Sequence, residues 1–289
     1  NYQAARDACA QARAATNDAN WIAQAQMVLA RSYLQQRNYP AARQEFARLL
    51  EMDDLERQLK WEAEALLGTI HLLPRMRTDH PRLFFNAETW PAVKTRALTV
   101  EQAHFSQMKA RVDRIPLEEI RPGDWASPDY GSAQVGLMEA AFVYRVTEDP
   151  VVLDKVRRML RGTADIFPDR RGSGERAYPS IAWVAALDWV WNDLVPPERE
   201  ALAEAMLRYA WDRVSECKSQ KDRRNWLGVW PHYYVGSMYG FAGIVLLEPA
   251  ADDVTYVRAL SLLGIGFKQY QERFASLLRT AGDDGVWQT

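Results

Sequence analysis

The chain has 289 residues, of which 48% are hydrophobic and 26% are charged, a composition typical of a globular protein. Its 36 Lys and Arg against 38 Asp and Glu give a formal net charge of −2, which excludes a dominant sequence-blind attraction to nucleic acid. No apolar run approaches the ~18 residues that a membrane span needs. Two cysteines, Cys9 and Cys217, are too few for a disulfide framework, so we expect free thiols.

The first seventy residues contain an internal repeat. Asn1–Arg6 and Asn38–Arg43 agree at five of six positions, at a separation of 37 residues. A recurrence of this period is typical of an array of helical hairpins. Apolar residues at helical spacing predict helices over 21–36 and 55–73, and another that begins around Pro40, a residue tolerated in the first turn.

These helices resemble tetratricopeptide repeats over about residues 1–73. Tyr33, Ala42 and Phe46 fall at the spacing of that motif, and Gly68 occupies the small position of the next unit, where two helices are expected to cross. We therefore expect tetratricopeptide-like helical hairpins over 1–75. Two roles stay open for them: a surface that docks a protein partner, or a collar that packs against the neighbouring domain.

A boundary is expected near residues 74–86, where Pro74 and Pro81 interrupt the helical period and His80 is read as structural. No run of alternating strands follows, so the sequence predicts an all-α protein. Almost wholly apolar helices alternate with amphipathic ones, which predicts inner and outer layers of an (α/α) toroid. The helices expected after the boundary cover 132–147, 150–166, 178–194, 197–216, 232–247 and 252–279.

Three loops hold the candidate binding residues, and the last two of them suggest the chemistry. The loops span 115–130, 167–178 and 221–234. Arginines of the last two loops can bind carboxylates or sulfates in a forked geometry, and aromatic rings can stack on sugar rings or bases, although core packing and surface solvation stay open for each residue. The candidate substrate-binding residues are Trp125, Arg170, Arg171, Tyr178, Arg223, Arg224, Trp226, Trp230, Tyr233 and Tyr234. Within the last loop, the density of polar aromatic residues around His232 leaves a functional and a structural histidine equally open.

Three features together resemble the N-terminal toroid of the heparinase II/III-like polysaccharide lyases. They are the segment His80–Phe85, the aromatic helix with Trp183 and Trp189, and the pair Asn225-Trp226 before an apolar helix. The resemblance implies an incomplete (α/α) toroid over 76–289, truncated before a C-terminal β-sandwich. It also implies that this chain alone has little activity.

The resemblance implies β-elimination from a uronic acid in an acidic polysaccharide. In that chemistry Asn225 neutralises the carboxylate and His232 removes the C5 proton, with Tyr233 and Tyr234 as alternatives or sugar contacts. The expected partner is a uronate-containing polysaccharide, in the periplasm or outside the cell. No cofactor is expected in this chain, and a structural metal is expected only in the absent C-terminal domain.

Two other classes of function stay open. A glycoside hydrolase needs two carboxylates about 5–10 Å apart, and Asp124, Asp129, Glu175 and Asp188 are available without forming a persuasive pair. A non-catalytic module would hold a glycan in the toroid and dock a protein through the repeats. Substitution of Asn225 and His232 would then leave its function unchanged.

Overall fold

The structure is a computed structural model that describes residues 2–120, 132–165, 181–216 and 232–280. Every regular element in these ranges is a helix and none is a strand, which confirms the prediction of an all-α protein. None of these helices combines the length and apolarity needed to cross a membrane. The chain forms two compact units: unit 1 joins Asn1–Met76 to Leu247–Thr289, and unit 2 is Arg77–Leu246.

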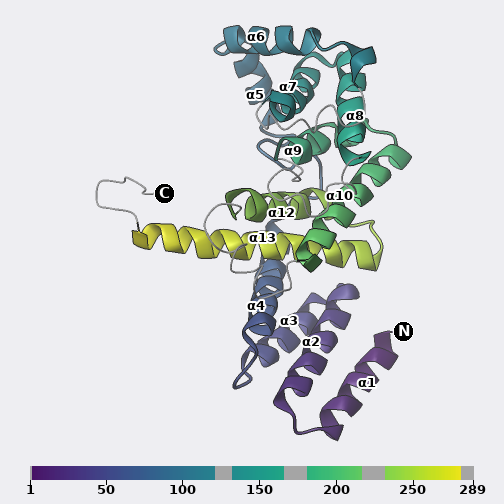
Figure 1. The fold of residues 1–289 in the computed structure, drawn as a ribbon, viewed down its shortest axis with the longest axis vertical. Coiled ribbons are helices and arrows are strands. Elements are labelled where there is room, and N and C mark those ends of the chain that lie inside the picture. The colour runs from purple at the N-terminus through teal and green to yellow at the C-terminus, as the bar shows by residue number, and fades with distance from the viewer. Residues whose placement is uncertain (1, 121–131, 166–180, 217–231, 281–289) are drawn as a thin grey trace. The chain divides into compact units, whose positions relative to one another are not determined.

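Unit 1 begins with four helices and a short 3-10 turn, and consecutive helices contact one another (Figure 1). The predicted helices over 21–36 and 55–73 are confirmed, and so is the helix around Pro40. Its first turn is capped by Asn38, whose side chain accepts the N–H of Ala41. The elements are α1 (Tyr2–Ala15), α2 (Ala19–Gln35), α3 (Tyr39–Leu50), α4 (Arg57–Leu72) and η1 (Leu73–Arg75).

The tight turn between α2 and α3 depends on Arg37, which has a left-handed φ of 57°. Its N–H donates to the carbonyl of Leu34, and the N–H of Asn38 donates to the carbonyl of Tyr33, both at 2.9 Å. This is the Schellman pattern, in which glycine is the usual residue at the left-handed position. An arginine there carries a strain that its side chain must offset.

The Arg37 side chain fastens this turn to the chain that precedes α13 (Asp253–Thr280). Its guanidinium donates to the carbonyls of Pro249 and Ala251 and lies 4.3 Å from the ring centroid of Tyr256. The Tyr256 hydroxyl in turn hydrogen-bonds the Tyr39 hydroxyl at 2.7 Å. A glycine at position 37 would relax the backbone but would lose the hydrogen bonds to Pro249 and Ala251 and the contact with the Tyr256 ring.

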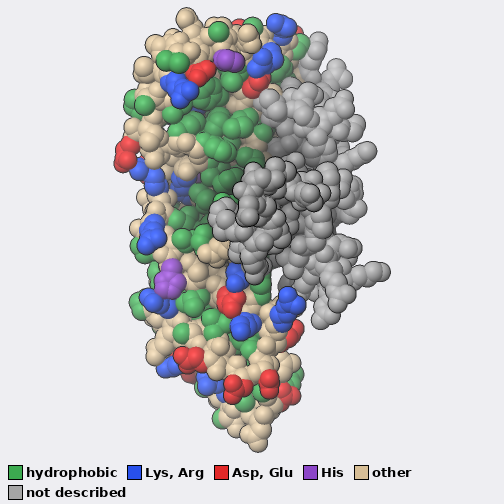
Figure 2. All heavy atoms as spheres, turned by 90° about the vertical axis from the view of Figure 1, so that its left-hand side faces the viewer, with side chains coloured by type: hydrophobic (Ala, Val, Ile, Leu, Met, Phe, Trp, Pro, Cys, Tyr) green, Lys and Arg blue, Asp and Glu red, His purple; other side chains and the backbone are tan. Residues whose placement is uncertain are grey.

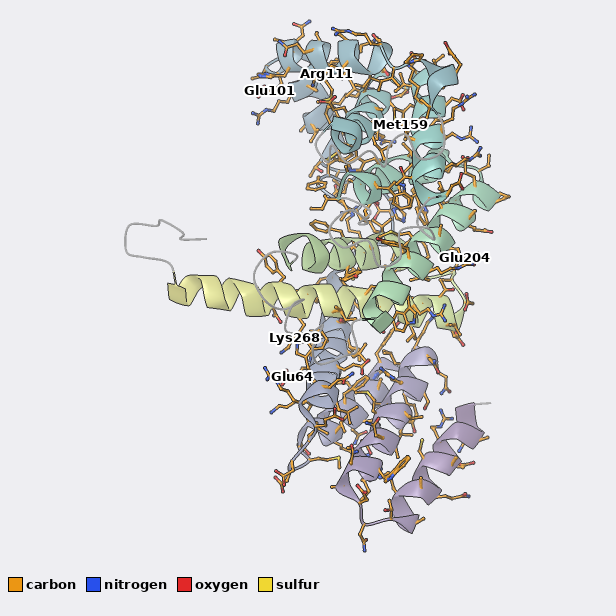
Figure 3. The ribbon with its side chains drawn as sticks, in the orientation of Figure 1. Glu64, Glu101, Arg111, Met159, Glu204 and Lys268 are labelled. Atoms are coloured by element: carbon orange, nitrogen blue, oxygen red, sulfur yellow. The ribbon has the colours of Figure 1, made fainter. Side chains whose placement is uncertain are left out.

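Helix α13 crosses α4 within unit 1 (Figure 1). At Gly264 a Cβ would lie 2.5 Å from the hydroxyl oxygen of Thr69 and 3.0 Å from the backbone oxygen of Ala65. Lys268 and Glu64 form an ion pair of 2.6 Å between the same two helices (Figure 3). Residues 247–280 therefore pack with the N-terminal helices, whereas the sequence placed them with the second domain. The domain boundary between residues 75 and 76, which the sequence suggested, stays a prediction.

The close approach at α4 is not where the sequence placed it. Among the described residues, no atom lies within 4 Å of a Cβ built at Gly68, so the expectation that Gly68 allows two helices to cross is wrong. The crossing instead uses Gly264, on a helix about 200 residues further along the chain. The repeat pattern could not reveal this partner because α13 carries no copy of the repeated segment.

Unit 2 follows the predicted helices closely. The predicted segment 178–194 is described from residue 181, as an α-helix that continues into a 3-10 turn. The elements are α5 (Trp90–Leu98), α6 (Gln102–Asp113), η2 (Leu117–Glu119), α7 (Ser132–Thr147), α8 (Pro150–Asp165), α9 (Ile181–Val190), η6 (Trp191–Asp193), α10 (Pro196–Glu216) and α12 (His232–Leu246).

Helix α9 is the centre of unit 2. All of its residues from Trp183 to Val190 are buried, and it contacts α7, α8 and α12. Amphipathic α8 buries one stripe that includes Val152 and Val156, and α10 contacts both α8 and α12. The expected alternation of apolar and amphipathic helices is thus present in the packing of α8 and α9, and closure into a toroid stays a prediction.

Gly264 and Gly68 form a matched pair for testing the α4–α13 crossing. We expect Gly264→Ala to lower the free energy of unfolding by about 1–3 kcal/mol, because the methyl group meets the α4 backbone. Gly68→Ala should raise it by up to about 1 kcal/mol, because the site is open and alanine favours a helix. Urea denaturation followed by circular dichroism measures both. Equal effects of the two substitutions would contradict the packing described for α13.

Asp252 caps α13 and makes unit 1 sensitive to acid. Its carboxylate accepts the N–H groups of Val254 and Thr255, and hydrogen bonds from Thr255 lower the pKa of this carboxyl. A carboxyl with a lowered pKa contributes stability above its unfolded pKa and loses it as pH falls through the folded value. Asp252→Asn keeps an equivalent cap, so it should match the parent protein in acid and be less stable near pH 7.

Urea denaturation over a series of pH values measures this contribution. Asp252→Ala, which removes the cap, should lose about 1 kcal/mol at pH 7. A constant difference between the parent and Asp252→Asn at all pH values would show that the carboxylate charge is not what stabilises the start of α13.

Candidate functional site

The side chains of all predicted site residues lie outside the described residues. His232, Tyr233 and Tyr234 open α12, and only their place in the helix is described. The assignments made from the sequence therefore stay predictions. The other predicted site residues, all outside the described ranges, are Trp125, Arg170, Arg171, Tyr178, Arg223, Arg224, Asn225, Trp226 and Trp230.

The structure does describe the segment Thr78–Phe85, which we call the anchor segment and which contacts the helix that begins at His232. The partner of the anchor segment is Asp188 on α9, whose side chain has no solvent exposure. The Asp188 carboxylate accepts a hydrogen bond from His80 Nδ1 at 2.6 Å and from the backbone N–H groups of Arg82 and Leu83 at 2.8 and 2.7 Å. A buried carboxylate needs such donors, because its loss of hydration is otherwise very costly.

The His80 ring is held from several sides. It stacks on the Trp191 ring at a centroid distance of 4.3 Å and an interplanar angle of 16°. The backbone carbonyl of His80 accepts a hydrogen bond of 3.0 Å from the Asn192 side chain. Trp191 and Asn192 both belong to η6, directly after α9. The end of α9 and the turn that follows it thus fix the start of the anchor segment.

Arg82 connects the anchor segment to α12. Its guanidinium donates to the carbonyls of Ile244 at 2.9 Å and Val245 at 3.3 Å, and also to the carbonyl of Thr78 at 2.6 Å. The first two carbonyls belong to the last turn of α12, where helix carbonyls lack intrahelical donors and a positive charge is favourable. Arg82 therefore fixes the C-terminal end of the helix that begins at His232.

The anchor segment ends in a strained turn. The N–H of Phe85 donates to the carbonyl of Leu83 at 2.8 Å, and Phe84 between them has a φ of 66°. This is the rare γ-turn with a positive central φ. Such a backbone conformation costs of order 1–3 kcal/mol for a residue other than glycine. Leu83 and Phe85 are buried, whereas Phe84 is 63% exposed.

Aromatic rings pack in a continuous cluster around this turn. Neighbouring ring centroids lie between 4.7 and 6.4 Å apart, within the range of favourable edge and offset contacts. The cluster consists of Phe84, Phe85, Trp90, Phe105, Phe142, Trp189 and Phe241. Hydrophobic side chains also gather in the upper part of the surface shown in Figure 2. The tryptophans of α9 and η6, Trp183, Trp189 and Trp191, are buried core residues.

The buried His80–Asp188 pair has the geometry of a base with its orienting carboxylate, but its surroundings give it a structural role. The side chain of His80 is only 3% exposed, and both oxygens of Asp188 accept hydrogen bonds. Asp188 therefore does not fit either carboxylate of a glycoside hydrolase, which must reach the scissile bond. The other carboxylates considered for that chemistry, Asp124, Asp129 and Glu175, lie outside the described residues.

A metal site does not occur in the described ranges, where no group of three or more His, Cys, Asp or Glu side chains could hold an ion. Cys9 is a buried free thiol, and Cys217 lies outside these ranges. Burial raises the pKa of the Cys9 thiol, which makes it less reactive.

Comparisons with known protein families, with curated proteins and with solved structures gave no match for this chain. Functional inference therefore depends on the residues themselves and on their packing.

The contribution of the Asp188 carboxylate to stability can be compared with that of an exposed carboxylate in the same unit. Asp188→Asn places amide hydrogens against N–H donors in a buried site, so we expect the free energy of unfolding to fall by about 3 kcal/mol. Asp154→Asn removes an exposed pair with Arg158 and should change it by less than about 1 kcal/mol. Urea denaturation measures both variants. A near-neutral Asp188→Asn would show that the anchor segment does not depend on this carboxylate.

Proposed function

We propose that residues 76–289 form the toroid portion of a heparinase II/III-like polysaccharide lyase and that tetratricopeptide-like hairpins precede it. One observation carries the proposal: the anchor segment contacts both α9 and α12. The single residue Arg82 links the two helices: its backbone N–H donates to Asp188 on α9, and its guanidinium donates to the carbonyl of Ile244 on α12. The sequence features that resemble the family are far apart along the chain, and two of them, the anchor segment and the aromatic helix, are direct packing partners.

The proposed reaction is β-elimination at a uronic acid. The C5 proton leaves, the bond to the leaving oxygen at C4 breaks, and a C4–C5 double bond forms. Asn225 hydrogen-bonds the carboxylate and stabilises the charge that develops on it. His232 takes the proton and returns one to the leaving oxygen, with Tyr233 or Tyr234 as alternative proton carriers. No redox step is involved.

The remaining candidate residues serve substrate binding in this proposal. Arginine side chains in the two later loops bind carboxylates or sulfates of the polysaccharide. Aromatic side chains stack on its sugar rings. By the same resemblance, the protein acts in the periplasm or outside the cell, and its complete active site includes a C-terminal β-sandwich.

A docking role for unit 1 is the second candidate. Trp21 and Val28 on α2 are 68% and 47% exposed. They are seven residues apart, so they lie on one face of the helix. Helical hairpin arrays often bind partners on such faces. This role is compatible with a lyase in the same chain, or with a module that binds glycan without cleaving it.

Absorbance of unsaturated products tests the proposal on the full-length protein with acidic polysaccharides. We expect His232→Ala to lower kcat by about 10²–10⁴-fold, because a proton-transfer group is lost. Asn225→Ala should lower it by about 10²–10³-fold, because a stabilising donor is lost. The matched control is His104→Ala on α6, an exposed histidine that should leave activity unchanged.

The alternatives give different outcomes in the same assay. New reducing ends without absorbance would indicate a hydrolase. Glycan binding that persists with no product, and that is unchanged in His232→Ala and Asn225→Ala, would indicate a binding module. Either result would overturn the proposed lyase.

A further inference from the structure

Phe84 occupies a position that glycine would fill without strain. Its φ of 66° is unusual for a bulky residue, and the ring gains little from burial because the residue is 63% exposed. Leu83 and Phe85 on either side already supply the buried side chains of this turn. Strained residues of this kind cluster at functional sites, and they persist where the surrounding structure fixes them.

The Phe84 ring follows an anchored stretch of backbone and lies against two other aromatic rings. The backbone of Leu83 is hydrogen-bonded on both sides: its N–H donates to Asp188, and its carbonyl accepts from Trp189 Nε1 at 3.0 Å. The Phe84 ring lies 6.2 Å from the Trp189 ring in an edge contact and 6.0 Å from the Phe241 ring. A ligand that binds such a ring orders little of the protein, which favours affinity.

We propose that Phe84 is a binding platform on which one pyranose ring of the polysaccharide stacks. The identity of this ligand rests on the proposed function, whereas the inference that Phe84 binds a ligand rests on the geometry of the turn and on the exposure of the ring. The C–H groups of a pyranose face carry partial positive charge, and the face of an aromatic ring carries the complementary negative charge. One aromatic residue offers about 150–250 Å², which suits a single sugar ring. It is far below the ~800 Å² per partner of a stable protein interface.

The test compares Phe84→Gly with the parent in the full-length protein. Binding is measured by affinity electrophoresis and calorimetry with alginate, chondroitin sulfate and heparan sulfate, and with a neutral glucan as reference. We expect at least a tenfold weaker binding of the acidic polysaccharide that the parent protein prefers. We also expect a melting temperature equal to or above that of the parent, because glycine relieves the strained turn. A purely structural ring would instead lower the melting temperature.

Further variants keep the test decisive. Phe84→Tyr keeps a flat ring and should retain binding within about twofold, whereas Phe84→Leu keeps apolar volume without a ring and should weaken binding like Phe84→Gly. Val100→Ala is the control, since Val100 is 79% exposed in the same unit and should have no effect. Unchanged binding in both Phe84→Gly and Phe84→Leu would overturn the platform. Loss of self-association in Phe84→Gly, with glycan binding intact, would also overturn it.

Failure of the platform and failure of the lyase proposal are distinguishable. If unsaturated products form with the same KM in the parent and in Phe84→Gly, the platform is wrong and the lyase stands. If no product forms but Phe84→Gly weakens glycan binding tenfold, the platform stands and the lyase is wrong.

Discussion

The buried carboxylate of Asp188 is the constraint on which unit 2 depends. A charge without solvent exposure needs donors from its own protein, and the anchor segment supplies an imidazole and two backbone N–H groups. Because Arg82 also binds the last carbonyls of α12, the path of this segment determines how the ends of α9 and α12 are held. One polar residue in an otherwise apolar helix thus organises three separate elements.

The same anchoring explains how a strained turn persists at the surface. Leu83 is held by Asp188 and Trp189, and Phe85 is buried among aromatic rings, so the residue between them has no freedom to relax. The strain at Phe84 is therefore offset by neighbours and not by its own contacts. A rigid foundation with an exposed ring is an arrangement suited to binding more than to core packing.

The position of α8 was predictable because this helix buries a stripe with the 3.6-residue period, which includes Val152 and Val156. Asp188 was visible in the sequence as the single charge in an apolar helix. Its partner His80 is 108 residues away, and no local pattern reports a hydrogen bond across that distance. The candidate site stays a prediction because its side chains lie outside the part of the chain that the structure describes.

The two glycines of unit 1 show the limit of a repeat pattern. Gly68 matches the repeat, yet among the described residues a Cβ added there would meet no atom, whereas Gly264 matches no repeat and allows α13 to meet the backbone of α4. Repeat sequences encode the contact of each unit with its neighbour, so the pattern stops where an unrelated helix completes the packing. Because unit 2 lies in sequence between α4 and α13, the hairpin array depends on chain segments at both ends of the insertion. A lesion at Gly264 should therefore disturb the packing of α4 although about 200 residues separate them in sequence.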